Sequence, residues 1–159
     1  MAMYAEYFAI KAFYGDRIAK RSGFKLMRHI EEGLNILDSI GASSKAKKAF
    51  CIHPLVQNNE GPEVGASEAY DLACEYRDRA NAYLCKPDTD KVNTVADVFK
   101  LVGPMSKDCR DMLVADKRQN FADFIIAHYR KHPRSKELFL YFQLWLAYLD
   151  SPIAVLRET

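Results

Sequence analysis

The chain has 159 residues, of which 49% are hydrophobic and 28% charged, and its formal net charge is +2 at pH 7. This length suits a single domain with one sizeable core, and the composition excludes a disordered or low-complexity chain. A net charge of +2 gives no general reason for nucleic-acid binding, so we predict no nucleic-acid partner. No apolar run approaches the roughly 20 residues that cross a bilayer, so we also predict no membrane partner.

The cysteines stand at positions 51, 74, 85 and 109, without a CxxC pair. Because zinc sites made of thiolates need closely spaced cysteines, we predict no zinc site from these residues. Cys51 and Cys74 lie in apolar helical contexts and are expected to be buried thiols. No signal peptide is recognisable, and unpaired thiols are typical of a reducing compartment, so we predict a cytoplasmic protein.

Apolar residues recur at spacings of three and four through most of the chain, which predicts amphipathic helices. No segment alternates apolar and polar residues, so the expected fold is all-α, a compact single domain of seven or eight helices. We expect residues 1–132 to form a helical core and residues 133–159 a C-terminal helix that packs on that core or forms a dimer face. The predicted helices cover residues 2–20, 26–40, 43–53, 66–84, 92–101, 105–115, 121–127 and 135–149, with a surface loop over residues 58–62.

The apolar run at 49–58 carries a histidine followed by a proline. A serine at 43 or 44 can cap the helix that leads into it. Pro54 has no amide hydrogen and biases His53 away from helical angles, so we predict that the helix kinks or ends here. A second helix boundary is predicted near Asp116. His29, His53 and Asp116 thus stand at predicted helix ends, and they are the candidate site residues.

The spacing of these residues resembles a known family. Lys20-Arg21-Ser22-Gly23 is followed by His29 six residues after the glycine, by Ile36-Leu37 and by His53. Ala115-Asp116-Lys117-x-x-Asn120 follows later in the chain. In this order the motifs resemble the HD-type hydrolase domain of the RelA/SpoT family and its small metazoan relatives, over roughly residues 1 to 128.

The resemblance implies a helical pocket for guanosine tetraphosphate (ppGpp) and a manganese ion held by two histidines and two aspartates. His29, His53 and Asp116 match three of those four metal ligands. The remaining ligand-binding candidates are basic or amide residues. Four of them match family positions that contact nucleotide or phosphate, and the lysine at position 25 is added because it contributes to the positive charge of the cleft. They are Lys20, Arg21, Lys25, Lys117 and Asn120.

The chain departs from the family where the chemistry is done. Pro54 stands in place of the fourth ligand, an aspartate, and proline cannot coordinate a metal. Gln57 and Asn58 stand in place of a Glu-Asp pair that helps to activate water. Their amides keep the shape of the acids but cannot accept a proton at neutral pH. Gln57, Asn58 and Glu60 are therefore the candidates for any catalytic role that remains.

The charge count favours binding without hydrolysis. With two imidazoles and one carboxylate left, the site is a poor host for a hard cation such as manganese, so we predict no cofactor. The alternative is a divalent metal, manganese or zinc, since two histidines and a carboxylate can bind zinc or iron(II). The basic residues leave the cleft net positive, which suits a polyphosphate.

Three functions therefore stay open. The first is a degenerate HD-domain protein that binds a phosphorylated, signalling-type nucleotide. The second is an active metal-dependent nucleotide phosphohydrolase, and the third is a helical scaffold, with a possible homodimer through the apolar C-terminal helix. His128 and His132, at helical spacing, could pair on a metal, but a solvated basic face before Pro133 explains them as well.

Overall fold

The computed structural model describes residues 4–61, 67–86 and 91–157. Seven α-helices and one 3₁₀-helix make up this part of the chain, and it contains no β-strand, so the all-α prediction is confirmed. The predicted helix starts at residues 2 and 66, and the last residue of the loop predicted at 58–62, lie outside the described residues. The helices are α1 (Ala5–Tyr14), α2 (Leu26–Ser39), α3 (Ser44–Asn58), α4 (Glu68–Ala82), α5 (Val95–Val102), α6 (Lys107–Ala127), α7 (Ser135–Asp150) and η1 (Pro152–Ala154).

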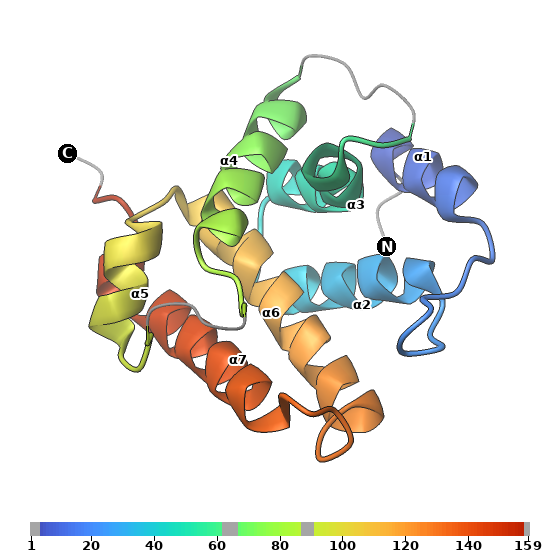
Figure 1. Cartoon of the computed structure of the whole chain (residues 1–159). Coiled ribbons are helices and arrows are strands. Elements are labelled where there is room, and N and C mark those ends of the chain that lie inside the picture. The colour runs from blue at the N-terminus through green and yellow to red at the C-terminus, as the bar shows by residue number, and fades with distance from the viewer. Residues whose placement is uncertain (1–3, 62–66, 87–90, 158–159) are drawn as a thin grey trace.

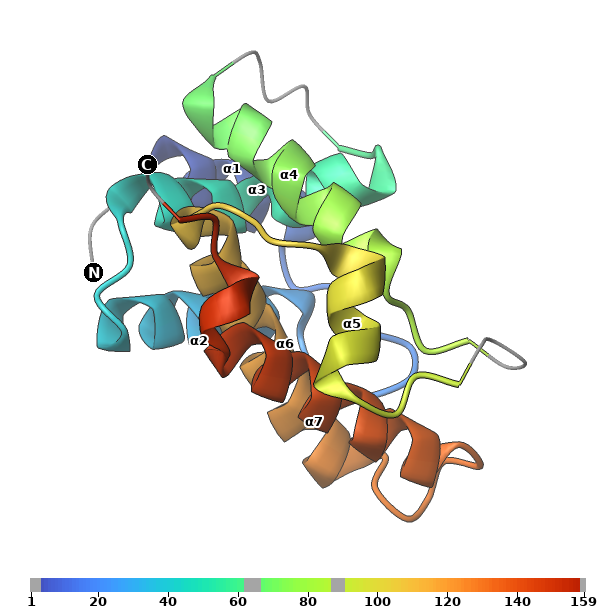
Figure 2. The same cartoon turned by 90° about the vertical axis from the view of Figure 1, so that its left-hand side faces the viewer.

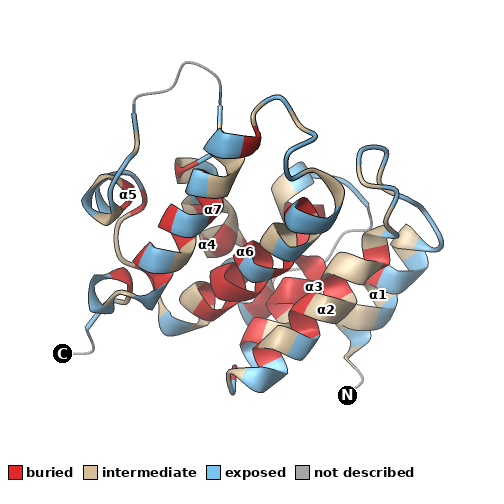
Figure 3. Ribbon diagram, turned by 90° about the horizontal axis from the view of Figure 1, so that it is seen from below, coloured by how far each residue is buried: buried red, intermediate tan, exposed pale blue. Residues whose placement is uncertain are grey.

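Helix α6 runs through the middle of the molecule and packs against α2, α3, α4 and α7 (Figure 1). Helices α1, α2 and α3 lie on one side of it, and α5 and α7 lie on the other (Figures 1 and 2). Buried residues are concentrated on α6 and α3 (Figure 3). One hydrophobic cluster extends from Ile10 in α1 to Ala154 in η1, so the described chain shares a single core. Within the described residues, no helix is long and apolar enough to cross a membrane.

The C-terminal helix packs on the core, which is one of the two arrangements expected for it. Its apolar stripe includes Trp145 and Tyr148, which are both fully buried. The indole Nε1 of Trp145 and the hydroxyl of Tyr141 both donate to the carbonyl of Tyr83 at the end of α4. Because these bonds tie α7 to α4 across α6, the C-terminal segment is part of the domain.

The first helix is shorter than predicted. Instead of extending to residue 20, α1 ends at Tyr14, and Gly15 adopts a positive φ of 52° that terminates it. The apolar Ile18, which fitted the helical spacing, is 59% exposed and forms an isolated bridge with Lys25. The segment between α1 and α2 is therefore a loop, and it carries three of the four predicted basic residues, Lys20, Arg21 and Lys25.

Of the two outcomes predicted at His53, a kink or an end of the helix, the end is wrong, because α3 continues through Pro54 to Asn58. The capping prediction is confirmed, since Ser43 Oγ accepts from the amide of Ala46. A proline inside a helix costs about 3 kcal/mol, partly because the carbonyl four residues earlier loses its donor. Here that carbonyl belongs to Phe50, and it bonds the Nδ1 of His53 instead. The side chain thus replaces the missing amide.

The predicted boundary near Asp116 is also wrong, since α6 is one helix of 21 residues. The polar run at 116–120 suggested a turn, but Asp116, Lys117 and Gln119 are buried inside the helix. They bond one another and helix α2, so their polar groups are satisfied without a loop. Burial of Cys51 is confirmed, whereas Cys74 is half-exposed, and all four cysteines are free.

Gly33 of α2 is needed because α3 approaches it closely. A Cβ at this position would collide with the ring of Phe50, which is fully buried and has no room to retreat. We expect Gly33→Ala to lower the free energy of unfolding by up to about 2 kcal/mol, since overpacking costs about 1–3 kcal/mol against a helix-propensity gain of ~1 kcal/mol. Urea unfolding measures this change. Asn35→Ala, on the exposed face of α2, is the control, and equal stability of both variants would contradict the packing argument.

Candidate functional site

Asp116 in the middle of α6 is the centre of a buried polar cluster. Its Oδ1 lies 3.1 Å from Nε2 of His29 on α2 and 3.8 Å from Nε2 of His53 on α3. One ligand atom from each of the three residues lies within 4.8 Å of the others. The three candidates thus converge as the sequence predicted, although only His29 lies near a helix end.

Lys117 pairs with the other oxygen of the same carboxylate. Its Nζ lies 3.1 Å from Asp116 Oδ2, and it stands over the rings of Trp145 and Tyr141 at 5.1 and 5.6 Å from their centroids. Asn120 Nδ2 donates to Asp116 Oδ1 at 3.2 Å. Lys117 is buried, with 6% of its surface exposed. Its charge therefore compensates Asp116 inside the protein and does not face solvent.

His29 is held by Gln119, a residue that the sequence analysis did not single out. Nδ1 of His29 is hydrogen-bonded to Oε1 of Gln119, and Nε2 of Gln119 donates to Glu32 at 3.1 Å and Asp123 at 2.8 Å. Because carboxylates only accept, the amide nitrogen of Gln119 must face them and its oxygen must face His29. The imidazole therefore donates from Nδ1. The signal for Gln119 in the sequence is faint: a polar residue one turn from Asp116.

His53 is enclosed by aromatic rings. Phe50 and Tyr76 lie 4.5 and 4.8 Å from the imidazole, between ring centroids, and the ring of His29 lies 5.4 Å away. The phenol of Tyr76 is hydrogen-bonded to Asp116. Tyr76, on α4, is the second residue missed from sequence, because nothing in its helix distinguishes it from a core aromatic.

The two histidines have opposite pKa shifts. Burial lowers the pKa of His29, but the hydrogen bond and charge of Asp116 outweigh it and raise the pKa above its usual value. Burial and the nearby His29 lower the pKa of His53 to about 4. Burial opposes ionisation of Asp116, yet Lys117 and His29 hold its pKa well below the usual range. Near pH 6.5 the positive charge of the imidazole pair is therefore on His29, and His53 is neutral.

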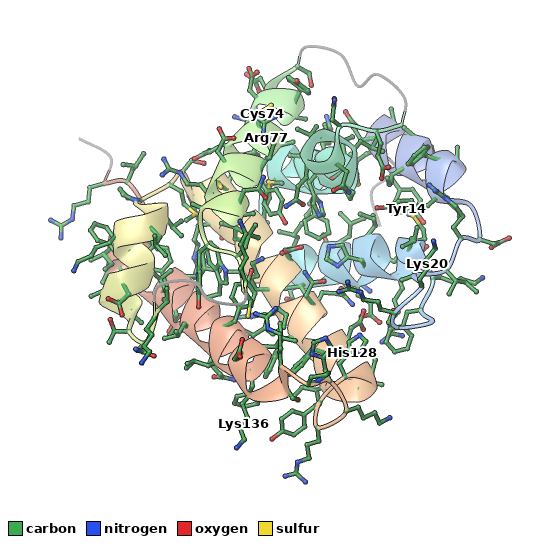
Figure 4. The ribbon with its side chains drawn as sticks, viewed as in Figure 1. Tyr14, Lys20, Cys74, Arg77, His128 and Lys136 are labelled. Carbon is green, nitrogen blue, oxygen red and sulfur yellow. The ribbon has the colours of Figure 1, made fainter. Side chains whose placement is uncertain are left out.

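A cleft of about 400 Å³ opens beside this cluster, and we call it the α2–α6 cleft. His29 and Asn120 line the cleft, and both also contact Asp116 inside the cluster. His128, at the C-terminal end of α6, lines the cleft as well (Figure 4). Its basic residues are Arg21 and Lys25. Its walls also contain two amide and four aromatic side chains: Gln119, Asn120, Tyr14, Phe24, Phe124 and Phe142.

Four of the eight predicted ligand-binding residues line this cleft: Arg21, Lys25, His29 and Asn120. His53, Asp116 and Lys117 lie behind it, and Lys20 is exposed in the adjoining loop (Figure 4). A larger cavity of about 580 Å³ lies between the end of α4 and α7. It contains none of the predicted residues, so we place the site at the smaller cleft, which is contiguous with the cluster.

The three catalytic candidates lie at the far end of α3. Gln57 Nε2 donates to Asn81 of α4 at 3.1 Å. Asn58 ends the helix, and Glu60 follows it, both exposed. Within the described chain, no hydrogen bond or ion pair links these residues to His29, His53 or Asp116. The rings of His128 and His132 meet edge to face past the end of α6, 6.2 Å apart between centroids and apart from the cluster.

Comparisons with known proteins give no family. No family model matches the chain, and neither a curated protein nor a solved structure matches it. The resemblance to the HD domain rests on the residues named above, and the site is interpreted from its own geometry.

The shifted histidines predict a stability optimum near pH 6.5 for chelator-treated protein. His29, whose pKa is raised on folding, stabilises fully below its unfolded pKa of about 6.5, and this contribution is lost as pH rises through the folded value. His53, whose pKa is lowered to about 4, remains neutral in the fold while the unfolded chain gains a proton. Stability therefore falls as pH drops from 6.5 to 4, by about 3 kcal/mol.

Urea unfolding between pH 4 and 9 measures this dependence, and His53→Gln isolates one part of it. Between pH 6.5 and 4 we expect the variant to lose the part of the fall in the free energy of unfolding that His53 causes. Above pH 6.5 the free energy of unfolding should still fall as in wild type. Parallel curves for wild type and variant below pH 6.5 would show that His53 is not held neutral.

Proposed function

We propose that the chain is a degenerate HD-type protein that binds a phosphorylated nucleotide in the α2–α6 cleft without hydrolysing it. One observation carries the proposal: a single cleft joins the basic Arg21 and Lys25 to His29 and Asn120 of the buried cluster. A ligand in it can contact cationic and amide donors at once.

The charges of the cleft favour an anion. Asp123, the acidic residue in its wall, already accepts from Arg28 at 3.2 Å and from Gln119. Arg21 has no ion-pair partner in the described part of the chain, and Lys25 makes a 3.4 Å pair with Asp16 that is exposed and hence weak. Guanidinium and ammonium groups that lack strong internal partners are available for charge-assisted bonds to phosphate.

The size and walls of the cleft favour a nucleotide over inorganic phosphate. Its volume of about 400 Å³ lies within the range of small-molecule sites, which are mostly apolar with a few placed polar groups. Phe24 and Tyr14 are half-buried and line the cleft. Aromatic faces bind nucleobases by stacking, so these two residues suit the base while Arg21 and Lys25 suit the phosphates.

The state of the catalytic candidates and of Asp116 supports binding without turnover. General-base catalysis needs a group that accepts a proton at the working pH, and the amides of Gln57 and Asn58 cannot do so. Gln57 is also engaged with Asn81. Asp116 is stabilised as the ionised form by Lys117 and His29, which makes it a weak proton acceptor.

We expect isothermal calorimetry of chelator-treated protein to show binding of ppGpp or of a nucleoside triphosphate. The double variant Arg21→Ala with Lys25→Ala should weaken that binding about tenfold, because each lost charge-assisted bond is partly screened by solvent. Lys100→Ala, an exposed lysine of α5 on the opposite side of the molecule, is the matched control. Absence of binding to every nucleotide tested would favour the scaffold or homodimer function, and metal-dependent release of phosphate would contradict the non-hydrolytic reading.

A second function, metal-dependent phosphohydrolysis, is favoured by one specific observation. Both imidazoles use Nδ1 for a protein acceptor and turn Nε2 toward Asp116 Oδ1. Metal-binding histidines commonly have this arrangement. The distances of 3.1 and 3.8 Å also bracket the roughly 3.3 Å that separates tetrahedral ligands of zinc. The donor set fits zinc or iron(II) and does not fit manganese, which prefers oxygen.

The second function predicts stoichiometric zinc. Elemental analysis after zinc loading should then find one equivalent per chain, lost in His53→Gln and kept in His132→Gln. Phosphate release should require the same metal. Substoichiometric zinc that is equal in both variants would remove this function and leave the first.

A further inference from the structure

The continuation of α3 through Pro54 has a consequence for the site. In an α-helix the carbonyl of Phe50 would accept from the amide of residue 54, and proline has no amide hydrogen. The free carbonyl is instead hydrogen-bonded to Nδ1 of His53. Because a carbonyl oxygen only accepts, His53 must donate from Nδ1.

The other ring nitrogen of His53 is thereby left without a proton. When Nδ1 carries the proton of a neutral imidazole, Nε2 is an acceptor. It lies 3.8 Å from Asp116 Oδ1, too far for a hydrogen bond and consistent with two acceptors facing each other. His29 differs, since its Nε2 lies at bonding distance, 3.1 Å, from the same oxygen. The two imidazoles thus present different faces to Asp116.

We propose that Pro54 is a positioning residue, whose missing amide reserves the Phe50 carbonyl for Nδ1–H of His53 and leaves Nε2 as an acceptor directed at Asp116. The acceptor is then ready for a cation between His53 and Asp116. The value of this arrangement for a bound cation rests on the second function proposed above, whereas the hydrogen bond does not.

A purely structural role for Pro54 makes a different prediction. Pro54 is buried in the core, and packing alone could account for its presence. In that case Pro54→Ala, which restores a helical amide, changes stability and leaves the ring of His53 unaltered. If Pro54 positions His53, the new amide of residue 54 competes for the Phe50 carbonyl, and the ring loses its exclusive acceptor.

The tautomer of His53 separates the two roles. Long-range ¹H–¹⁵N spectra of ¹⁵N-histidine-labelled, chelator-treated protein at pH 7 report which nitrogen is protonated, and His53→Gln assigns the signals among four histidines. We expect wild type to show the Nδ1–H form alone. Pro54→Ala should show at least a tenth of the ring as the Nε2–H form, which can donate to Asp116. Pro133→Ala removes the proline of the surface pair His132-Pro133 and should leave His53 unchanged.

The inference fails if wild type shows the Nε2–H form, or if Pro54→Ala retains the wild-type spectrum. The wild-type spectrum decides the tautomer even if the variant does not fold. Calorimetry on the same samples keeps the proposals apart, because nucleotide binding to wild type tests the proposed function and the tautomer of His53 tests the role of Pro54. The expected tautomers with no nucleotide binding to wild type would support the role of Pro54 and remove the proposed function.

Discussion

The buried carboxylate of Asp116 is the constraint on which the arrangement of the helices depends. An ionised carboxylate in a protein interior is costly unless charges and hydrogen bonds compensate it. Here the compensation comes from His29 of α2, Tyr76 of α4, and Lys117 and Asn120 of α6 itself. Through the rings beside Lys117, α7 takes part as well. The polar cluster therefore requires the same helix packing that the hydrophobic core produces.

The charge of the cluster follows from this compensation. One carboxylate faces a buried ammonium and an imidazole whose pKa is raised, so the cluster is net positive when His29 is protonated. Since His29 also lines the α2–α6 cleft, that positive charge reaches the ligand-accessible surface. A site with four acids would repel phosphate, whereas a net positive site favours an anion. The function we propose, binding of an anionic ligand, follows from that positive charge.

Much of the fold could be predicted from the sequence, because helical spacing of apolar residues is a local signal. The errors fell where tertiary contacts override local preferences. A side-chain bond from His53 allows α3 to pass Pro54, and no propensity records such a bond. The polar run around Asp116 by itself indicates a boundary, because the burial of charged residues depends on partners from other helices, which the local sequence does not show.

The candidate site was predicted in part for the same reason. Spacing and residue type identified His29, His53 and Asp116, and the structure brings them together. Their supporting residues, Gln119 and Tyr76, could not be found, since their roles exist only through contacts between helices. Position along the chain also could not distinguish cations at the surface from a cation inside the core.

The most direct test of the account is to observe where a nucleotide binds. Titration of ppGpp into ¹⁵N-labelled protein, followed by backbone and side-chain amide spectra, maps the contacted residues without assuming any activity. The account predicts shifts in the loop between α1 and α2, at His29 and at the side-chain amide of Asn120, with α5 unchanged. Shifts confined to the cavity between α4 and α7, with the α2–α6 cleft unaffected at saturation, would contradict it.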